Sequence, residues 1–449
     1  MEHIKALQNK KIGIWGFGKV GRSYLAFCAT QGISCTIYDQ RHLTPDEQAL
    51  IRDHNATVAQ HISLAEFLSQ HDVILASPGI NTNPYRNQAQ FMCELDLFSQ
   101  AWHKPYIGIT GTLGKTTITT LLGQLLSKAF PVAVGGNIGT PMLDLLPQQS
   151  DVDLAILELS SWQLEHTNTC SPAIAIWTNL FANHLDRHQT MEAYVHAKAR
   201  ILTYQKPQEC LIAPFSLRDQ ILATDTQATC CWISTEDLTQ QIALLGKNEC
   251  AIYIRNTSVI RHAYNKEVTL YSTKNLPKQG FLSNWLILSA TLDRLQLPLE
   301  LLSKDTFCAL PHRLENIAAP LPGVYINDSK STTAASTLAA IQMYQQQSMM
   351  LILGGLSKGI DRTGLIAQLP PSIKKVFCFG KEAHELLRMC KEHGIEAHAY
   401  NTLPEVMEAL KTIVQNNDIV LFSPSGASFD LYANYEERGN HFKLLALNN

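Results

Sequence analysis

The sequence has few of the features that mark membrane, secreted or nucleic-acid-binding proteins. No stretch approaches the ~18 uninterrupted apolar residues of a membrane-spanning helix, and the N-terminal MEHIKALQNKK lacks the apolar core of a signal peptide. A net charge of −3 supplies no basic excess for nucleic acid. The eleven cysteines form no C-x-x-C pair, which is typical of free thiols in a reducing compartment. These absences predict a cytoplasmic protein without membrane or nucleic-acid partners.

Short apolar runs alternate with helical patterns along most of the 449 residues, a length that suits two or three domains. The segment KKIGIWGFGKVGRSYLAFCATQGISCTIYDQR reads as strand, glycine turn, helix and strand, with Gly32 capping the helix. Such alternation predicts parallel sheets with crossover helices. Residues 205–280 contain four short strand-like runs, and the sequence does not give their order in a sheet. The boundaries that we predict are 1–100, 101–304 and 305–449.

The first glycine loop follows a strand and opens a helix. Its glycines are Gly16, Gly18 and Gly21, and Asp39 ends the next strand 18 residues after Gly21. This G-x-G-x-x-G pattern is typical of a turn that holds a diphosphate at a helix N-terminus. The diphosphate could belong to NAD or to another nucleotide-linked ligand, and a tight turn that binds nothing is the alternative.

The second glycine loop, TGTLGKTT at residues 110–117, also lies between a strand and a helix. The usual phosphate-loop pattern has a glycine five residues before Gly114, where this chain has Ile109. Lys115 could reach the outer phosphates of a nucleotide and Thr116 could bind Mg²⁺. Two phosphate loops on two domains predict two phosphorylated ligands, whereas a dehydrogenase needs only one.

Several polar residues follow other strands or lie on predicted helices. Glu158 ends a strand, and His184 and Arg187 follow another. Lys198 lies four residues after Tyr194 and shares its helical face. Each has an alternative structural reading: Lys198 could keep its charge in water, Arg187 could be a surface charge, and Asp328 could cap a helix that begins at Lys330.

The order of these stretches resembles the Mur ligases, which are ATP-dependent amide-forming enzymes. The matching stretches are TGTLGKTT, GGNIG, LELSSWQLE, NHLDRH, AKARI, LPHRLE, NDSKSTT and GGLSKGID. The first glycine loop, SPGI and SPSGASFDLYANYEERG are similar to the branch that joins D-glutamate to UDP-N-acetylmuramoyl-L-alanine in peptidoglycan precursor synthesis. The resemblance implies an α/β protein with a Rossmann-like N-terminal domain, a central P-loop ATPase-type domain and a Rossmann-like C-terminal domain. We also expect a monomer.

The resemblance assigns a role to each candidate residue, with ATP and Mg²⁺ as cofactors. The implied catalytic residues are Lys115, Glu158, His184 and Lys198. The implied ATP-binding residues are Gly111, Thr112, Gly114, Lys115, Thr116, Thr117, Arg313 and Asp328. Mg²⁺ would be held by Thr116, Glu158, His184 and Lys198, the last as a carbamate. The UDP-linked substrate would contact Gly18, Lys19, Val20, Asp39, Gln40, Arg41, Ser77, Gly79 and Asn137. D-Glutamate would contact Lys330, Thr332, Lys358, Ser428, Phe429 and Tyr435.

A few positions depart from the family pattern. Asn183 stands where an acidic residue is usual, Val20 replaces a hydroxyl residue, and the helix GFLSNWLILSA lacks three polar residues near the ATP base. Three alternatives therefore stay open. They are a ligase for another amino acid, including a folylpolyglutamate-type enzyme, an NAD-dependent oxidoreductase, and a nucleotide-binding regulator without chemistry.

Overall fold

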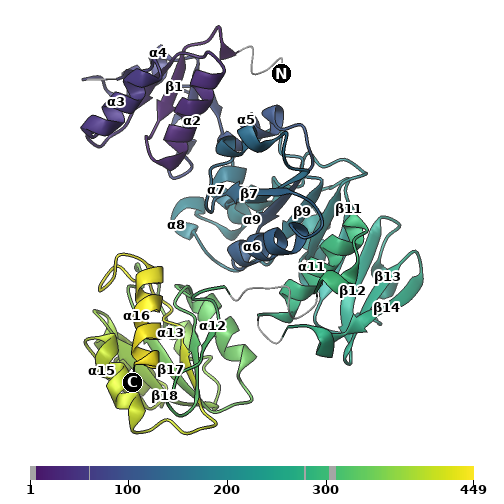
Figure 1. Ribbon diagram of the computed structural model, residues 1–449, viewed down its shortest axis with the longest axis vertical. Helices are drawn as coiled ribbons and strands as arrows, with labels where there is room; N and C mark the ends of the chain where they lie inside the picture. The colour runs from purple at the N-terminus through teal and green to yellow at the C-terminus, as the bar shows by residue number, and fades with distance from the viewer. Residues whose placement is uncertain (1–6, 60, 278–279, 303–309, 449) are drawn as a thin grey trace. The chain divides into compact units, whose positions relative to one another are not determined.

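Figure 1 shows the computed structural model, which describes residues 7–59, 61–277, 280–302 and 310–448. The chain forms two compact units, the first from residues 1–277 and 282–307 and the second from residues 278–281 and 308–449. The first unit contains two sheets and the second contains one. All three combine parallel strands with helices, as the alternating pattern predicted.

The first sheet has five parallel strands in the order β3-β2-β1-β4-β5. The strands are β1 (Ile12–Trp15), β2 (Cys35–Tyr38), β3 (Thr57–Val58), β4 (Val73–Ala76) and β5 (Phe91–Met92), and the helices are α2 (Lys19–Thr30), α3 (Pro45–Asp53), α4 (Leu64–Gln70) and α5 (Glu94–Ala101). Gly32 caps α2 as predicted, with a φ of +65°. Because β1 neighbours β4, the strand order reverses between them, and ligands of such sheets bind at this crevice.

The second sheet has nine strands in the order β14-β13-β12-β11-β10-β9-β6-β8-β7. The strands are β6 (Tyr106–Thr110), β7 (Val132–Gly136), β8 (Leu154–Glu158), β9 (Ile174–Trp177), β10 (Cys210–Pro214), β11 (Thr229–Ser234), β12 (Glu249–Arg255), β13 (Ser258–Ala263) and β14 (Lys266–Ser272). The helices are α6 (Lys115–Leu126), α7 (Ser161–Leu164), α8 (Leu185–His188), α9 (Met191–Ala199), α10 (Arg218–Leu222) and α11 (Leu282–Leu295). The runs between 205 and 280 thus extend one sheet, and β13, which the sequence did not reveal, joins β12 to β14 in antiparallel pairs.

The third sheet has the order β15-β16-β20-β17-β18-β19, and only β15 is antiparallel to its neighbour. The strands are β15 (Glu315–Ile317), β16 (Val324–Asn327), β17 (Met349–Gly354), β18 (Ile373–Phe379), β19 (Ala397–Tyr400) and β20 (Ile419–Phe422). The helices are α12 (Ala334–Met343), α13 (Thr363–Ile366), α14 (Ala383–Glu392), α15 (Leu403–Lys411) and α16 (Tyr435–Leu447). Short 3-10 helices complete the chain: η1 (Asn83–Tyr85), η2 (Leu143–Gln148), η3 (Phe215–Leu217), η4 (Ile242–Leu244), η5 (Thr273–Asn275) and η6 (Leu299–Leu302).

Alternate residues of β17 build separate cores on the two faces of the third sheet. Leu351 and Leu353 pack with residues of α12, α13 and α14. Met350 and Ile352 pack with residues of α15 and α16. A strand that is buried on both faces reads as a continuous apolar run, which is why MMLILG predicted a strand without predicting its partners.

The carboxyl group of Glu94 is buried in the first unit without full hydrogen bonding. Glu94, the first residue of α5, is 1% exposed, and its Oε1 accepts a hydrogen bond from the Leu143 backbone N–H at 3.3 Å. Its Oε2 is buried and has no hydrogen-bond partner among the described residues. Burial raises the pKa of Glu94 to about 7. The folded protein therefore keeps the Glu94 proton at a pH where the unfolded chain has lost it.

We expect Glu94→Gln to stabilise the protein at pH 8 and to have little effect at pH 5. With a pKa raised above its unfolded value, Glu94 destabilises the folded state increasingly as pH rises from about 4.5 to about 7, by roughly 3 kcal/mol at ~1.4 kcal/mol per unit. Thermal unfolding of both proteins at several pH values measures this. A difference in melting temperature that is the same at pH 5 and pH 8 would contradict the raised pKa.

Candidate active site

A glycine-rich turn joins β6 to α6 in the interior of the nine-stranded sheet. Gly111 and Gly114 have φ values of +141° and +80°, which favour glycine. A Cβ on Gly111 would lie 2.0 Å from Thr178 Oγ1, just past β9. Ile109, which occupies the glycine position of the usual pattern, is fully buried in β6 and pairs with Glu158. The missing glycine therefore falls inside the strand, before the turn begins.

The residues after β9 hold this turn in shape. The Thr178 hydroxyl donates to the Leu113 carbonyl at 2.6 Å. The Asn179 side chain donates to the same carbonyl at 3.0 Å and accepts from the Leu113 N–H at 2.8 Å. Neither Thr178 nor Asn179 was among the residues predicted from the sequence. Their position at the carboxyl end of a strand beside β6 was the available signal.

Two lysines meet at one backbone carbonyl of the turn. Lys198 Nζ donates to the Gly111 carbonyl at 2.7 Å, and Lys115 Nζ donates to the carbonyls of Gly111 and Thr112, both at 3.0 Å. Lys198 is 1% exposed, so the reading that its charge stays in water is wrong. Burial, and next the charge of Lys115, hold the pKa of Lys198 well below its usual range. The buried lysine thus has access to its neutral, nucleophilic form.

Glu158 lies at the end of β8 with one oxygen engaged. Its Oε1 accepts from Asn137 Nδ2 at 2.9 Å, and its carbonyl accepts from the Asn137 N–H at 2.8 Å. Its Oε2 is buried without a hydrogen-bond partner among the described residues. The structure thus brings Asn137, which was assigned to the UDP-linked substrate, against the candidate metal ligand Glu158.

His184 precedes α8 and has a left-handed backbone, with φ of +55°. Its ring meets the Trp162 ring edge-on, with centroids 5.3 Å apart, and lies 6.3 Å from the Tyr194 ring. The Tyr194 hydroxyl is 3.2 Å from Thr112 Oγ1, and the Tyr194 ring lies 4.5 Å from Lys198 Nζ. Aromatic contacts therefore link His184 to the glycine turn and to Lys198.

The predicted metal ligands are only partly of the ordinary ligand types. Within residues 7–59, 61–277, 280–302 and 310–448, no three His, Cys, Asp or Glu side chains gather as a metal site. The predicted set contains Glu158 and His184 from these types, with Thr116 and Lys198 as the remaining members. A magnesium site here would depend on hydroxyl and carbamate oxygens, and it stays a prediction.

The segments that follow β1, β2 and β4, at the crevice where the strand order reverses, carry all the residues assigned to the UDP-linked substrate except Asn137. Asp39 accepts from the Phe17 N–H at 2.6 Å and from the Arg41 N–H at 3.0 Å. Arg41 binds Glu47 with two nitrogens, at 2.9 and 2.7 Å, and this pairing lowers the pKa of Glu47 to about 2. Ser77 Oγ donates to the Gly16 carbonyl at 3.0 Å. The two turns of the crevice are thus fastened to each other.

The remaining residues of this crevice differ in accessibility. Gly18, Lys19, Gln40 and Gly79 are exposed, and Val20 is half-buried. Lys19 Nζ donates to the Gly139 carbonyl of the GGNIG stretch after β7. This hydrogen bond connects the first glycine loop directly to the segment that carries Asn137.

In the second unit, candidate residues follow β16, β17 and β20, whose carboxyl ends lie at one edge of the sheet. Asp328 is 5% exposed and accepts from the hydroxyls of Ser331 and Ser423, the latter at 2.9 Å. Burial raises its pKa to about 6. The interpretation of Asp328 as a helix cap is wrong, because the next helix begins at Ala334 and is capped by Thr333.

The residues assigned to D-glutamate include two cation–aromatic pairs. Lys330 Nζ lies 3.7 Å from the Tyr435 ring centre and Lys358 Nζ lies 5.7 Å from that of Phe429. Phe429 is 64% exposed. Ser428 is buried, Thr332 is exposed, and Arg313, assigned to ATP, lies half-buried just before β15. These residues present apolar and cationic groups around the same sheet edge.

A buried arginine that the sequence analysis did not single out joins two of these loops. Arg438 is fully buried and donates to the Ser329 carbonyl at 2.7 Å, to Ser329 Oγ at 3.0 Å and to the Gly426 carbonyl at 2.9 Å. It thereby ties NDSKSTT to SPSGAS. Nothing in the local pattern of YEERG distinguishes this arginine from a solvated charge on a helix.

Three domain profiles of one family match in chain order. The Mur ligase MurD-like N-terminal domain matches residues 10–92, the Mur ligase middle domain matches 109–279, and the Mur ligase glutamate ligase domain matches 312–426. No helix among the described residues has the length and apolar character needed to cross a membrane. The matches follow the three sheets and confirm the predicted three-domain α/β fold.

Curated relatives cover nearly the entire chain. The UDP-N-acetylmuramoylalanine–D-glutamate ligase of Escherichia coli O6:H1 is 32% identical, and that of Yersinia pseudotuberculosis is 31% identical, each over 98% of both chains. The MurF ligase of Thermotoga maritima in complex with ADP shares the fold, with a TM-score of 0.59 at 14% identity over 99% of this chain and 96% of that one. The chain therefore belongs to the Mur ligase family, and it is an ATP-dependent ligase that forms amide bonds.

Proposed function

We propose that this protein joins D-glutamate to UDP-N-acetylmuramoyl-L-alanine in the cytoplasm, as a step of peptidoglycan precursor synthesis. Relatives named for this activity match 98% of the chain, including both glycine loops and the C-terminal SPSGASFDLYANYEERG. The geometric observation that carries the proposal is the meeting of Lys115 and Lys198 at the Gly111 carbonyl. It sets the lysine that would bind phosphate beside a buried lysine amine.

The reaction moves the γ-phosphoryl group of ATP to an oxygen of the substrate carboxylate and releases ADP. The amine of the amino acid then attacks the acyl carbon, the C–O bond to phosphate breaks, and the amine loses a proton as the amide forms. Phosphoryl transfer depends on positioning and on neutralising charge. Lys115 and the backbone N–H groups at the N-terminus of α6 would hold the β- and γ-phosphates.

Mg²⁺ fits the oxygen atoms that this site offers. Glu158 Oε2 is a buried carboxylate oxygen without a hydrogen-bond partner among the described residues, and hard cations prefer such ligands. Thr116, Glu158, His184 and a carbamylated Lys198 would hold the metal, which when bound neutralises phosphate charge. A neutral Lys198 amine adds to CO₂ and releases one proton to give the carbamate, and the lowered pKa of Lys198 favours that form.

Most of the residues that would bind the UDP-linked substrate precede the ATP loop along the chain, and those that would bind D-glutamate follow it. The crevice residues from Gly18 to Gly79, with Asn137, would contact the UDP-linked substrate, with Lys19 and Arg41 as its cations. Lys330, Thr332, Lys358, Ser428, Phe429 and Tyr435 would contact D-glutamate. Cations and hydroxyls suit a dicarboxylate, because charge-assisted hydrogen bonds are the stronger ones.

The assay that tests the proposal measures phosphate release from ATP with UDP-N-acetylmuramoyl-L-alanine and a panel of amino acids. We expect release with D-glutamate and less than about one hundredth of that rate with the others, because one mismatched buried polar contact costs ~10²-fold or more. Release with another amino acid would assign a related ligase. A spectral change with NADH and no phosphate would overturn the proposal.

Carbamylation of Lys198 predicts a ¹³C signal from labelled bicarbonate that is present in the wild type and absent in Lys198→Arg. Arginine keeps a positive charge but cannot form the carbamate. We expect both Lys198→Arg and Lys198→Ala to lose activity by at least ~100-fold, as when an electrostatic contact in the transition state is removed. Full activity of Lys198→Ala, with or without bicarbonate, would remove Lys198 from the mechanism.

Gly111→Ala should weaken ATP binding by about 100-fold or more. The added Cβ overlaps Thr178 Oγ1 at 2.0 Å and must shift the turn. The matched control is Gly32→Ala, at a positive φ with open space around it, which should cost about 1 kcal/mol of stability and leave ATP affinity unchanged. Calorimetric titration with ATP measures both. Equal affinities for the wild type and Gly111→Ala would show that the turn does not bind the phosphates.

A further inference from the structure

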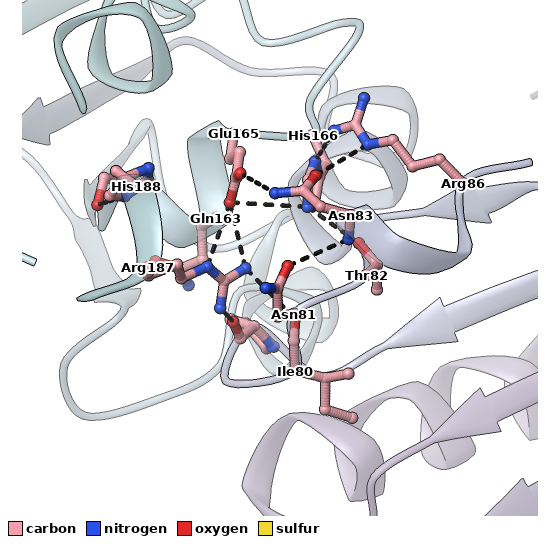
Figure 2. Close-up of polar contacts among 12 residues, drawn as sticks. Ile80, Asn81, Thr82, Asn83, Arg86, Gln163, Glu165, His166, Arg187 and His188 are labelled. Atoms are coloured by element: carbon pink, nitrogen blue, oxygen red, sulfur yellow. Dashed lines mark hydrogen bonds and ion pairs between the residues drawn. The ribbon is translucent and has the colours of Figure 1, made fainter. Parts of the chain in front are cut away.

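Arg187, on the short helix α8, reaches from the central sheet to the N-terminal sheet. Its Nη1 donates to the Pro78 carbonyl at 3.0 Å and its Nη2 to the Ile80 carbonyl at 3.3 Å (Figure 2). Its Nε and Nη2 both donate to Glu165 Oε2, at 3.3 and 3.2 Å. The side chains of Arg187 and Glu165 are only 7% and 14% exposed. The reading of Arg187 as a solvated surface charge is therefore wrong.

The segments that Arg187 joins carry residues of both candidate sites. Residues 78–80 form the turn after β4, which includes Gly79 and follows Ser77. On the other side, the Arg187 guanidinium lies 5.1 Å from the centre of the Trp162 ring, and that ring meets His184 edge-on. Arg187 thus contacts the backbone of the substrate turn and the aromatic support of His184 with one planar group.

Glu165 fixes the chain that continues from this turn. Its Oε1 accepts from Asn83 Nδ2 at 2.7 Å while its Oε2 accepts from Arg187. The next residue, His166, lies with Nε2 3.0 Å from Thr82 Oγ1 (Figure 2). The segment from Pro78 to Asn83 is therefore held at several points, by Arg187, Glu165 and His166.

The chemistry of arginine accounts for these contacts. A guanidinium offers several donors in one plane, so it can bind two carbonyls and a carboxylate at the same time. A lysine carries the same charge on a flexible stem and cannot match that arrangement. Because the group is largely removed from water, each lost hydrogen bond leaves a poorly solvated acceptor behind. The turn would then sample other conformations.

We propose that Arg187 and Glu165 are positioning residues for the UDP-linked substrate, which hold residues 78–80 in the conformation that binds it. This assignment rests on the proposed function of the turn at residues 77–79. Neither side chain needs to touch the substrate. If loss of the contacts leaves the turn competent only a tenth of the time, the apparent dissociation constant rises tenfold while the bound complex is unchanged.

The test compares Arg187→Lys with Arg218→Lys. Arg218 is a matched control, because its Nε and Nη2 bind Glu249 at 2.6 and 3.0 Å, its Nη2 donates to the Leu244 carbonyl, and its side chain is 15% exposed. Its contacts lie among residues 218–249, and β12, which begins at Glu249, is separated from β6 by β11, β10 and β9 in the sheet. Calorimetric titration of each full-length variant with UDP-N-acetylmuramoyl-L-alanine gives the dissociation constant, and steady-state kinetics give KM for each substrate.

We expect Arg187→Lys to raise the dissociation constant and the KM for UDP-N-acetylmuramoyl-L-alanine by about tenfold. The KM values for ATP and D-glutamate should stay within about twofold and kcat within about threefold, and Arg218→Lys should change none of them. Glu165→Gln should act in the same direction, and the double variant should fall short of the product of the two single effects, because both act on one turn.

Three results would overturn the assignment: unchanged affinity in Arg187→Lys, an equal rise of KM for all three substrates, or a loss confined to kcat. Wild-type protein that does not bind UDP-N-acetylmuramoyl-L-alanine would instead refute the proposed function. If the wild type binds this substrate and Arg187→Lys binds it with the same affinity, only the positioning role is refuted.

Discussion

The carbonyl oxygen of Gly111 is the point on which the central site depends. It accepts hydrogen bonds from Lys115 and Lys198, and the residue that carries it must be glycine, because its φ is positive and the turn packs closely against Thr178. Two cations beside one carbonyl repel each other, and burial adds to that penalty for Lys198. This electrostatic cost is smaller when Lys198 is neutral. A single backbone oxygen thus links the glycine-rich turn to a buried lysine 87 positions away.

Local sequence patterns predicted much of the fold because most strands of this chain are buried on both faces. Runs such as YIGIT and MMLILG predicted buried strands, and the glycine turns after IGIW and YIGIT were predicted to bind phosphate. The order of strands between 205 and 280 could not be read in the same way. The order is set by pairing between segments. The strand β13 was missed because Arg261 and His262 interrupt its apolar run. The candidate catalytic residues were proposed because each follows a strand or shares a helical face, and their roles stay predictions.

Contacts across the chain were not predictable from those patterns. Two contacts join residues whose local sequence gives no sign of a partner: that of Asn137 with Glu158 and that of Arg438 with Ser329. Carboxylates were the hardest to interpret. Asp39 and Asp328 were both assigned to ligands, yet their oxygens accept hydrogen bonds from neighbouring loops. In both places the carboxylate accepts hydrogen bonds that hold a neighbouring loop in its conformation.

The central sheet also has a free edge at β14, where Lys266, Glu267 and Val268 are exposed. An open edge offers unpaired N–H and C=O groups to any other extended chain. Here opposite charges stand side by side on the outermost strand, and the register between β13 and β14 shifts at Val259 and Ile260. Such an irregular, charged border disfavours continuation of the sheet into a second molecule, so the sheet can extend to nine strands without offering an edge for aggregation.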